Sequence, residues 1–325
     1  MWTCSEIRQA ARSRIKLSLW AVILVTLVYT AIISVLPMIN ATITTMMQLP
    51  VLTGSGNIEE MLPLLSITSM IAPLINLAMI VLMFLVFNPM YVGYIRYLGS
   101  IEKESSDIGN DVKSLFWAFR DERYGRVLSG TAWKQLWMMI WGWVVSAIVF
   151  IPASILMVFL FIELFSGFTG RRNYNDFIDI FTRETGNRVL FWVVVLFGYF
   201  LIAGIGVTIF LLNRFYAYLF TEFVLTERTD MPYKAALDLS KQMTRGLKMK
   251  LFVLDLSFIG WYILSALTLN ILMLWLLPYR ISAYQEVYDR RKQELGIIMN
   301  PPVPQMGQPE QYPQPAQPYG NGAQG

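Results

Sequence analysis

The chain has 325 residues, of which 55% are hydrophobic and only 15% are charged. Soluble domains carry about 25% charged residues, and here the mean hydropathy is +0.49. The composition excludes an ordinary soluble protein and predicts an all-α polytopic membrane protein. Histidine is absent and Cys4 is the single cysteine, which excludes His-dependent triads, most zinc sites and disulfides within the chain.

Apolar blocks long enough to cross a bilayer recur along the chain, since a span needs about 20 apolar residues. The predicted spans are residues 17–39, 64–87, 136–162, 189–212, 251–268 and 271–288. The first block exceeds the length of a signal-peptide core and no cleavage site follows it, so we expect it to stay as an anchor. The stretch 251–279 fits either one long helix or two, which leaves five spans as the alternative to six.

The distribution of basic residues favours six spans. Basic loops are retained in the cytoplasm. With a cytoplasmic N-terminus, six spans place 22 of the 26 Lys and Arg residues inside, whereas five spans place 18 there. We therefore predict a multi-pass membrane protein with both termini in the cytoplasm. Arg280 then falls within the last helix and must reach the interface or line a polar interior.

The segments around the spans have distinct characters. Residues 1–16 are predicted to form a basic cytoplasmic helix, residues 17–290 the transmembrane domain, and residues 291–325 a disordered tail rich in Pro and Gln. Apolar residues recur at helical spacing in 111–119 and 233–247, which predicts short cytoplasmic amphipathic helices. We favour packing of these helices on neighbouring spans, with contact to anionic lipids or to a partner as the alternatives.

Three ionisable residues form the candidate polar site within the membrane: Asp255, Tyr262 and Arg280. Asp255 and Tyr262 are seven residues apart and so share a helix face. One hypothesis is a proton or cation relay, because ionisable residues within spans are costly and usually functional. The alternative, which we favour, is an interfacial Asp255 hydrogen-bonded to Ser257 or to nearby backbone amides.

The third predicted span carries aromatic and small residues at regular spacing. Trp133, Trp137 and Trp141 recur every four residues, which is typical of an interfacial belt and, as the alternative, of a ligand-binding stripe. Gly142 and Ser146 form a small-xxx-small pair suited to close helix packing.

Motifs that carry enzymatic chemistry are missing from the sequence. It contains no Walker motif, no nucleophile elbow and no carboxylate pair at useful spacing. We therefore expect a protein that is not an enzyme, with no catalytic, cofactor-binding or metal-binding residues and no nucleic-acid partner.

A resemblance to a known family rests mainly on the C-terminal region. The segment 250–262 (KLFVLDLSFIGWY) is followed by Leu267, Thr268, Leu269, Trp275, Pro278, Tyr279, Tyr284 and Tyr288. With residues 7–12, Leu19-Trp20 and 235–240, this pattern resembles an uncharacterised bacterial integral membrane family, domain of unknown function 975, over about residues 5–290. Family members usually have Gly where this chain has Asn270. The resemblance implies a six-span inner-membrane protein and brings no activity or site residues.

Two functional hypotheses follow from the sequence. The first is a non-enzymatic scaffold or accessory subunit of an envelope or export assembly, with the lipid bilayer and a membrane protein as partners. The alternative is a permease for small solutes or ions that uses the polar site near Asp255.

Overall fold

The computed structural model describes residues 2–53, 58–101, 108–120, 123–168, 184–228 and 231–296, and the regular structure of these residues is helical. This confirms the prediction of an all-α fold. Residues 169–183, between the third and fourth predicted spans, lie outside the described residues, as does the predicted tail from residue 297 onward.

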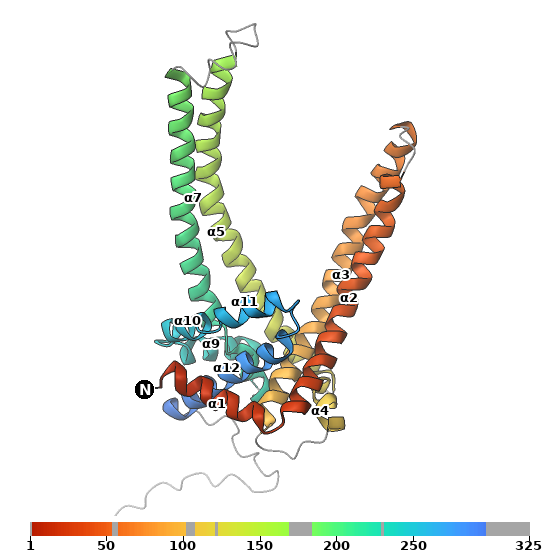
Figure 1. Cartoon of the computed structure of the whole chain (residues 1–325), viewed down its shortest axis with the longest axis vertical. Coiled ribbons are helices and arrows are strands. Elements are labelled where there is room, and N and C mark those ends of the chain that lie inside the picture. The colour runs from red at the N-terminus through yellow and green to blue at the C-terminus, as the bar shows by residue number, and fades with distance from the viewer. Residues whose placement is uncertain are drawn as a thin grey trace, which may run out of the picture.

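Two long helical hairpins rise from a base of short helices and diverge from each other (Figure 1). The first consists of α2 (Leu19–Thr53) and α3 (Ile58–Ser100), and the second of α5 (Arg123–Phe168) and α7 (Glu184–Ala217). The helices of each hairpin pack on each other. At 1.5 Å per residue, the 35 residues of α2 extend over about 50 Å, which exceeds the hydrocarbon thickness of a bilayer.

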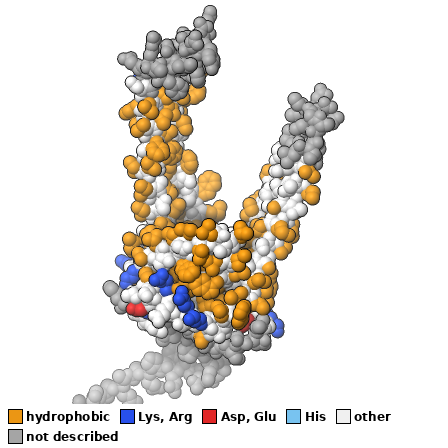
Figure 2. All heavy atoms as spheres, viewed as in Figure 1, with side chains coloured by type: hydrophobic (Ala, Val, Ile, Leu, Met, Phe, Trp, Pro, Cys, Tyr) orange, Lys and Arg blue, Asp and Glu red, His pale blue; other side chains and the backbone are white. Residues whose placement is uncertain are grey.

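The base contains the shorter helices and most of the buried core. Its helices are α1 (Cys4–Lys16), α4 (Ile108–Ser114), the 3-10 helix η1 (Trp117–Phe119), α8 (Thr221–Glu227), α9 (Tyr233–Met243), α10 (Lys248–Leu256), α11 (Ile259–Leu267) and α12 (Met273–Leu295). Its core includes Ile7, Tyr94, Leu251 and Tyr288, from four different helices, and Phe220 from the turn before α8. The hairpins instead expose large hydrophobic side chains along their length (Figure 2), as expected for surfaces that face lipid.

Local sequence signals fix the ends of the base helices. Thr3 caps α1: its side chain accepts a hydrogen bond from the Glu6 backbone N–H, and the Glu6 carboxylate accepts one from the Thr3 backbone N–H. Helix α12 ends at Gly296, whose φ of 60° is left-handed. Because α12 continues to Leu295, its last turns extend into the segment that we assigned to the tail.

The number of candidate spans among the described residues, judged by length and composition, differs from the favoured prediction of six. Among the described residues, five segments are long and apolar enough to cross a membrane, which is the number that we gave as the alternative. The predicted span 271–288 coincides largely with α12. Helix α12 is not among these five apolar segments. Its second half carries Glu286, Asp289 and Arg290, and charges at the bilayer centre are costly. Helix α12 packs instead against α1 in the base.

The fifth apolar segment, Lys248–Leu267, contains two short helices, α10 and α11. Both lie across the feet of the hairpins rather than along them (Figure 1). At the break between them, the Phe258 N–H donates to the Asp255 carbonyl at 2.9 Å, and the Phe258 ring is fully buried against Tyr279. This buried ring holds the break against the core of the base.

Candidate functional site: a carboxylate surrounded by donors

The Asp255 side chain lies where α7, α10 and α12 meet, and side chains from two neighbouring helices donate to it. The Tyr216 hydroxyl, from α7, donates to Oδ2 at 2.8 Å. Arg280, from α12, donates through Nε to Oδ1 at 3.1 Å and through Nη2 to Oδ2 at 3.4 Å. The Tyr284 hydroxyl also donates to Oδ1. Both carboxylate oxygens therefore have two donors each.

The Arg280 guanidinium joins this carboxylate to two further aromatic residues. Its Nη1 donates to the Tyr262 hydroxyl at 3.0 Å, and its Nε is 2.9 Å from the Tyr284 hydroxyl. The guanidinium carbon lies 5.8 Å from the Tyr262 ring centroid and 5.2 Å from that of Tyr284, within the range of cation–π attraction. We call Asp255, Arg280, Tyr216, Tyr262 and Tyr284 the Asp255 cluster.

The environment fixes the charges of the α12 members of the cluster. Burial opposes the charged form of Arg280, but Tyr284, Asp255 and Tyr262 raise the pKa of its guanidinium above the usual value. Burial raises the pKa of Tyr284 well above its ordinary range. At neutral pH Arg280 is therefore a cation and Tyr284 a neutral donor. The Asp255 carboxylate is paired with Arg280, and each of its oxygens already accepts two hydrogen bonds. A proton transferred to Asp255 would therefore have to displace one of these donors.

The structure brings together the three residues that the sequence singled out: Asp255, Tyr262 and Arg280. Tyr216 and Tyr284 were not among the predicted site residues. Tyr284 lies one helical turn after Arg280, so the spacing of i and i+4 could have indicated it. Tyr216 comes from another helix, 39 residues before Asp255, and no local pattern predicts that contact. Ser257, suggested as a partner of Asp255, donates instead to the Leu254 carbonyl at 2.6 Å.

The predicted small-residue pair forms no helix contact within the described part of the chain. A Cβ atom at Gly142 would meet no other atom within 4 Å, and Ser146 is exposed. The tryptophans on the same helix are packed within the chain. Trp137 and Trp141 stack on each other, and the Trp141 indole N–H donates to the Tyr218 hydroxyl at 3.3 Å.

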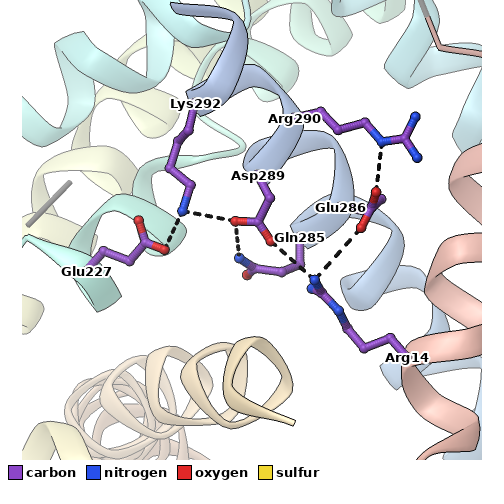
Figure 3. A network of polar contacts seen from close by, with 7 residues as sticks. All are labelled: Arg14, Glu227, Gln285, Glu286, Asp289, Arg290 and Lys292. Carbon is purple, nitrogen blue, oxygen red and sulfur yellow. Dashed lines mark hydrogen bonds and ion pairs between the residues drawn. The ribbon is translucent and has the colours of Figure 1, made fainter. Parts of the chain in front are cut away.

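A second polar network ties α1 and α8 to α12 (Figure 3). Arg14 of α1, which is buried, lies 3.3 Å from Asp289 and 3.8 Å from Glu286. Lys292 lies 2.6 Å from Glu227 of α8 and 2.9 Å from Asp289. These ion pairs are satisfied by partners within the base, so the network is suited to holding helices together.

No group of three or more His, Cys, Asp or Glu side chains in the described part of the chain is arranged to hold a metal ion. Potential ligands such as Asp255, Asp289 and Glu227 are occupied by cations and hydroxyl groups.

Comparison with protein families gives a match to the family described as Protein of unknown function (DUF975), over residues 1–294. The match covers most of the chain, including both hairpins and nearly all of the base. The chain belongs to this family. No curated protein and no solved structure matches the chain.

For this DUF975 member, the family assignment brings no activity with it. The matched residues contain the whole Asp255 cluster and the α1–α12 network, as well as the segment 250–288 on which the resemblance rested. Asn270, where a Gly was expected, has a φ of 66°. Asn tolerates this left-handed conformation better than most residues, so the turn between α11 and α12 forms without glycine.

Proposed function

We propose that this protein is a non-enzymatic scaffold or accessory subunit of an envelope or export assembly in the bacterial plasma membrane. Its base would lie in the cytoplasm and its hairpins would recruit the spans of a partner. Family membership and the apolar helices support a membrane protein, and the following features support the scaffold role.

The divergence of the two hairpins carries this proposal (Figure 1). The helices within a hairpin cover one another, but their other faces expose large hydrophobic side chains, including Trp143, Ile148 and Ile151 of α5. A permease encloses a polar path between its spans, whereas separated apolar hairpins offer surfaces to other helices.

The open surface of α5 has the composition of a helix-packing site. Gly142 leaves open space beside the helix, and Ser146 follows one turn later on the exposed surface. Small residues let two backbones approach closely, which is the main source of helix association in lipid. We therefore place the contact with a partner span along Gly142 and Ser146.

Photo-crosslinking in the native host tests this proposal. A crosslinking amino acid at Phe150, which is exposed one helical turn after Ser146, is expected to capture one defined membrane polypeptide, identified by mass spectrometry. Gly142→Leu should abolish that adduct, because a bulky side chain separates the helices, whereas the matched control Ile155→Leu should leave it unchanged. Adducts with lipid alone, or an adduct that Gly142→Leu does not affect, would contradict the scaffold role.

A second candidate function is a permease for small solutes or ions, favoured by the Asp255 cluster at the edge of the apolar region. A permease of this kind would show solute or proton flux in proteoliposomes, and Asp255→Asn would abolish it. The absence of flux in the unmodified protein would exclude this alternative. Flux that persists in Asp255→Asn would show that the cluster does not carry it.

A further inference from the structure

Two cations, Arg214 and Lys248, lie at the junction of α7 and α10. Lys248 begins α10, and its Nζ donates to Asn213 Oδ1 at 2.5 Å. Arg214 lies in the last turn of α7, and α7 and α10 pack together. The two side chains are close enough for their like charges to repel. Among the residues that the structure describes, neither cation has an acidic partner.

Several other cations of the base are neutralised within the chain. Arg14 and Lys292 pair with carboxylates of α8 and α12, Lys134 lies 2.5 Å from Glu222, and Arg280 pairs with Asp255. Asp255, on the same helix as Lys248, is occupied by Arg280 and tyrosine hydroxyls. The positive charge of Arg214 and Lys248 is therefore left uncompensated.

Aromatic residues hold Arg214 in place. Its guanidinium carbon lies 4.0 Å from the Trp141 ring centroid and 5.2 Å from that of Phe210. The faces of these rings fix the guanidinium plane and leave its N–H groups able to bind an anion. Trp141 itself is anchored through Tyr218, so the cation is presented from a rigid support.

The surroundings of this pair are apolar and exposed. Ile209, just before Phe210 on α7, is 63% exposed, and Met249, directly after Lys248, is 70% exposed. In Figure 2, Lys and Arg side chains gather on the base just below a band of hydrophobic side chains. A ligand bound here would meet positive charge at one end and apolar surface at the other.

We propose that Arg214 and Lys248 bind the phosphate of an anionic phospholipid, with its acyl chains against the exposed apolar residues of α7 and α10. A guanidinium and an ammonium complement a phosphodiester in charge and hydrogen bonding. The position at the foot of a hairpin matches the depth of lipid headgroups. This site is independent of the scaffold role and of the Asp255 cluster.

Native mass spectrometry of the full-length protein in detergent tests the site, with phosphatidylglycerol and phosphatidylcholine as probes. The unmodified protein is expected to retain phosphatidylglycerol in preference to phosphatidylcholine. Each basic residue near the headgroups contributes an electrostatic attraction to an anionic lipid. Because Arg214→Gln/Lys248→Gln removes two such residues, it should weaken binding of phosphatidylglycerol by about tenfold or more. The charge-conserving Arg214→Lys/Lys248→Arg should retain the preference.

The matched control is Lys113→Gln/Arg120→Gln, which removes two exposed cations from another part of the base and should leave lipid binding unchanged. If the double variant of the site fails to fold, Lys248→Gln alone replaces it. Equal retention of the two lipids by the unmodified protein would overturn the proposal, as would an unchanged preference in the site variants. Displacement of the lipid by millimolar inorganic phosphate would instead identify a site for soluble anions.

Discussion

At the scale of single residues, Asp255 accepts hydrogen bonds from the side chains of Tyr216, Arg280 and Tyr284. Asp255→Asn removes the counter-ion of Arg280, whose side chain is 29% exposed. Breaking a partly buried pair in this way should lower the free energy of unfolding by about 2–3 kcal/mol, measured as thermal or denaturant unfolding in detergent. The control Asp238→Asn breaks the exposed pair with Lys241 and should cost about 1 kcal/mol or less. Equal effects would show that the cluster adds no stability.

A second prediction concerns the close approach of α3 to the segment after α4. A Cβ at Gly93 would lie 2.4 Å from the Leu115 carbonyl oxygen, which belongs to the backbone and cannot rotate away. Gly93→Ala should therefore destabilise the protein by about 1–3 kcal/mol. Gly125→Ala is the control, because a Cβ there meets no atom within 4 Å, and it should be neutral or stabilising by up to about 1 kcal/mol. A tolerated Gly93→Ala would show that the two segments are not in tight contact.

The residues of the candidate site show how far sequence reasoning reaches. Asp255 and Arg280 could be singled out because charges are rare in apolar stretches. The donors from other helices could not, since the Tyr216 contact depends on how α7 packs against α10. For the same reason, the pairing of Arg14 with Asp289, 275 residues later, has no signal in the sequence.

At the scale of elements, the turn between α11 and α12 contains two non-glycine residues in the left-handed region. Leu269 has a φ of 51° and Asn270 a φ of 66°. A left-handed conformation costs an ordinary residue about 1–2 kcal/mol. Leu269→Gly should therefore stabilise the protein by up to about 1 kcal/mol, because Leu269 is 86% exposed and loses little packing. Asn270→Gly should have a smaller effect of the same sign. Gly296→Ala, at a φ of 60°, should have the opposite sign, and a destabilising Leu269→Gly would contradict this account.

The helices of the hairpins could be predicted because long apolar runs are a strong signal. Helix α12 could not be placed, because its first half is apolar enough for a span while its second half is charged. A hydropathy profile is an average over neighbouring residues in the sequence. It therefore cannot show that Tyr284 and Tyr288 are buried in the core of the base. The position of α12 is therefore decided by packing and by ion pairs with α1 and α8.

At the scale of the whole molecule, the buried tyrosines and Lys292 predict how stability depends on pH. Burial raises the pKa of Tyr284 and Tyr288. Burial opposes the charge of Lys292, but Glu227 and Asp289 raise the pKa of its ammonium group. In the unfolded chain these groups lose their protons near pH 10, while the folded protein keeps them. These groups should therefore leave the free energy of unfolding unchanged from neutral pH to about pH 9 and make it fall as the pH rises further. Tyr288→Phe should make this fall shallower, and an unchanged slope would contradict the assignment.

The contact between α1 and α12 also limits the number of membrane crossings. Helix α1 precedes the first hairpin and α12 follows the last apolar segment, yet Arg14 pairs with Asp289 and the Tyr279 hydroxyl donates to the Arg8 carbonyl at 3.3 Å. Two helices in contact must lie on the same side of the bilayer. An even number of crossings separates them, so the two hairpins account for four and the fifth apolar segment cannot cross alone. Its helices α10 and α11 then lie in the interface, as their orientation in Figure 1 suggests.

Labelling of cysteines by a membrane-impermeant maleimide tests this topology. Cys4, the single cysteine of the chain, reports on α1. In a Cys4→Ser background, Glu294→Cys reports on α12 and Leu267→Cys, at a residue that is 76% exposed, on the end of α11. If the base lies in the cytoplasm, as we propose, Cys4 and Glu294→Cys should be labelled only in inverted membrane vesicles. Leu267→Cys should not be labelled in intact cells, since α11 does not reach the outer surface. Labelling of Cys4 and Glu294→Cys from opposite sides of the membrane would establish an odd number of crossings and would separate α12 from α1, which their ion pairs do not allow.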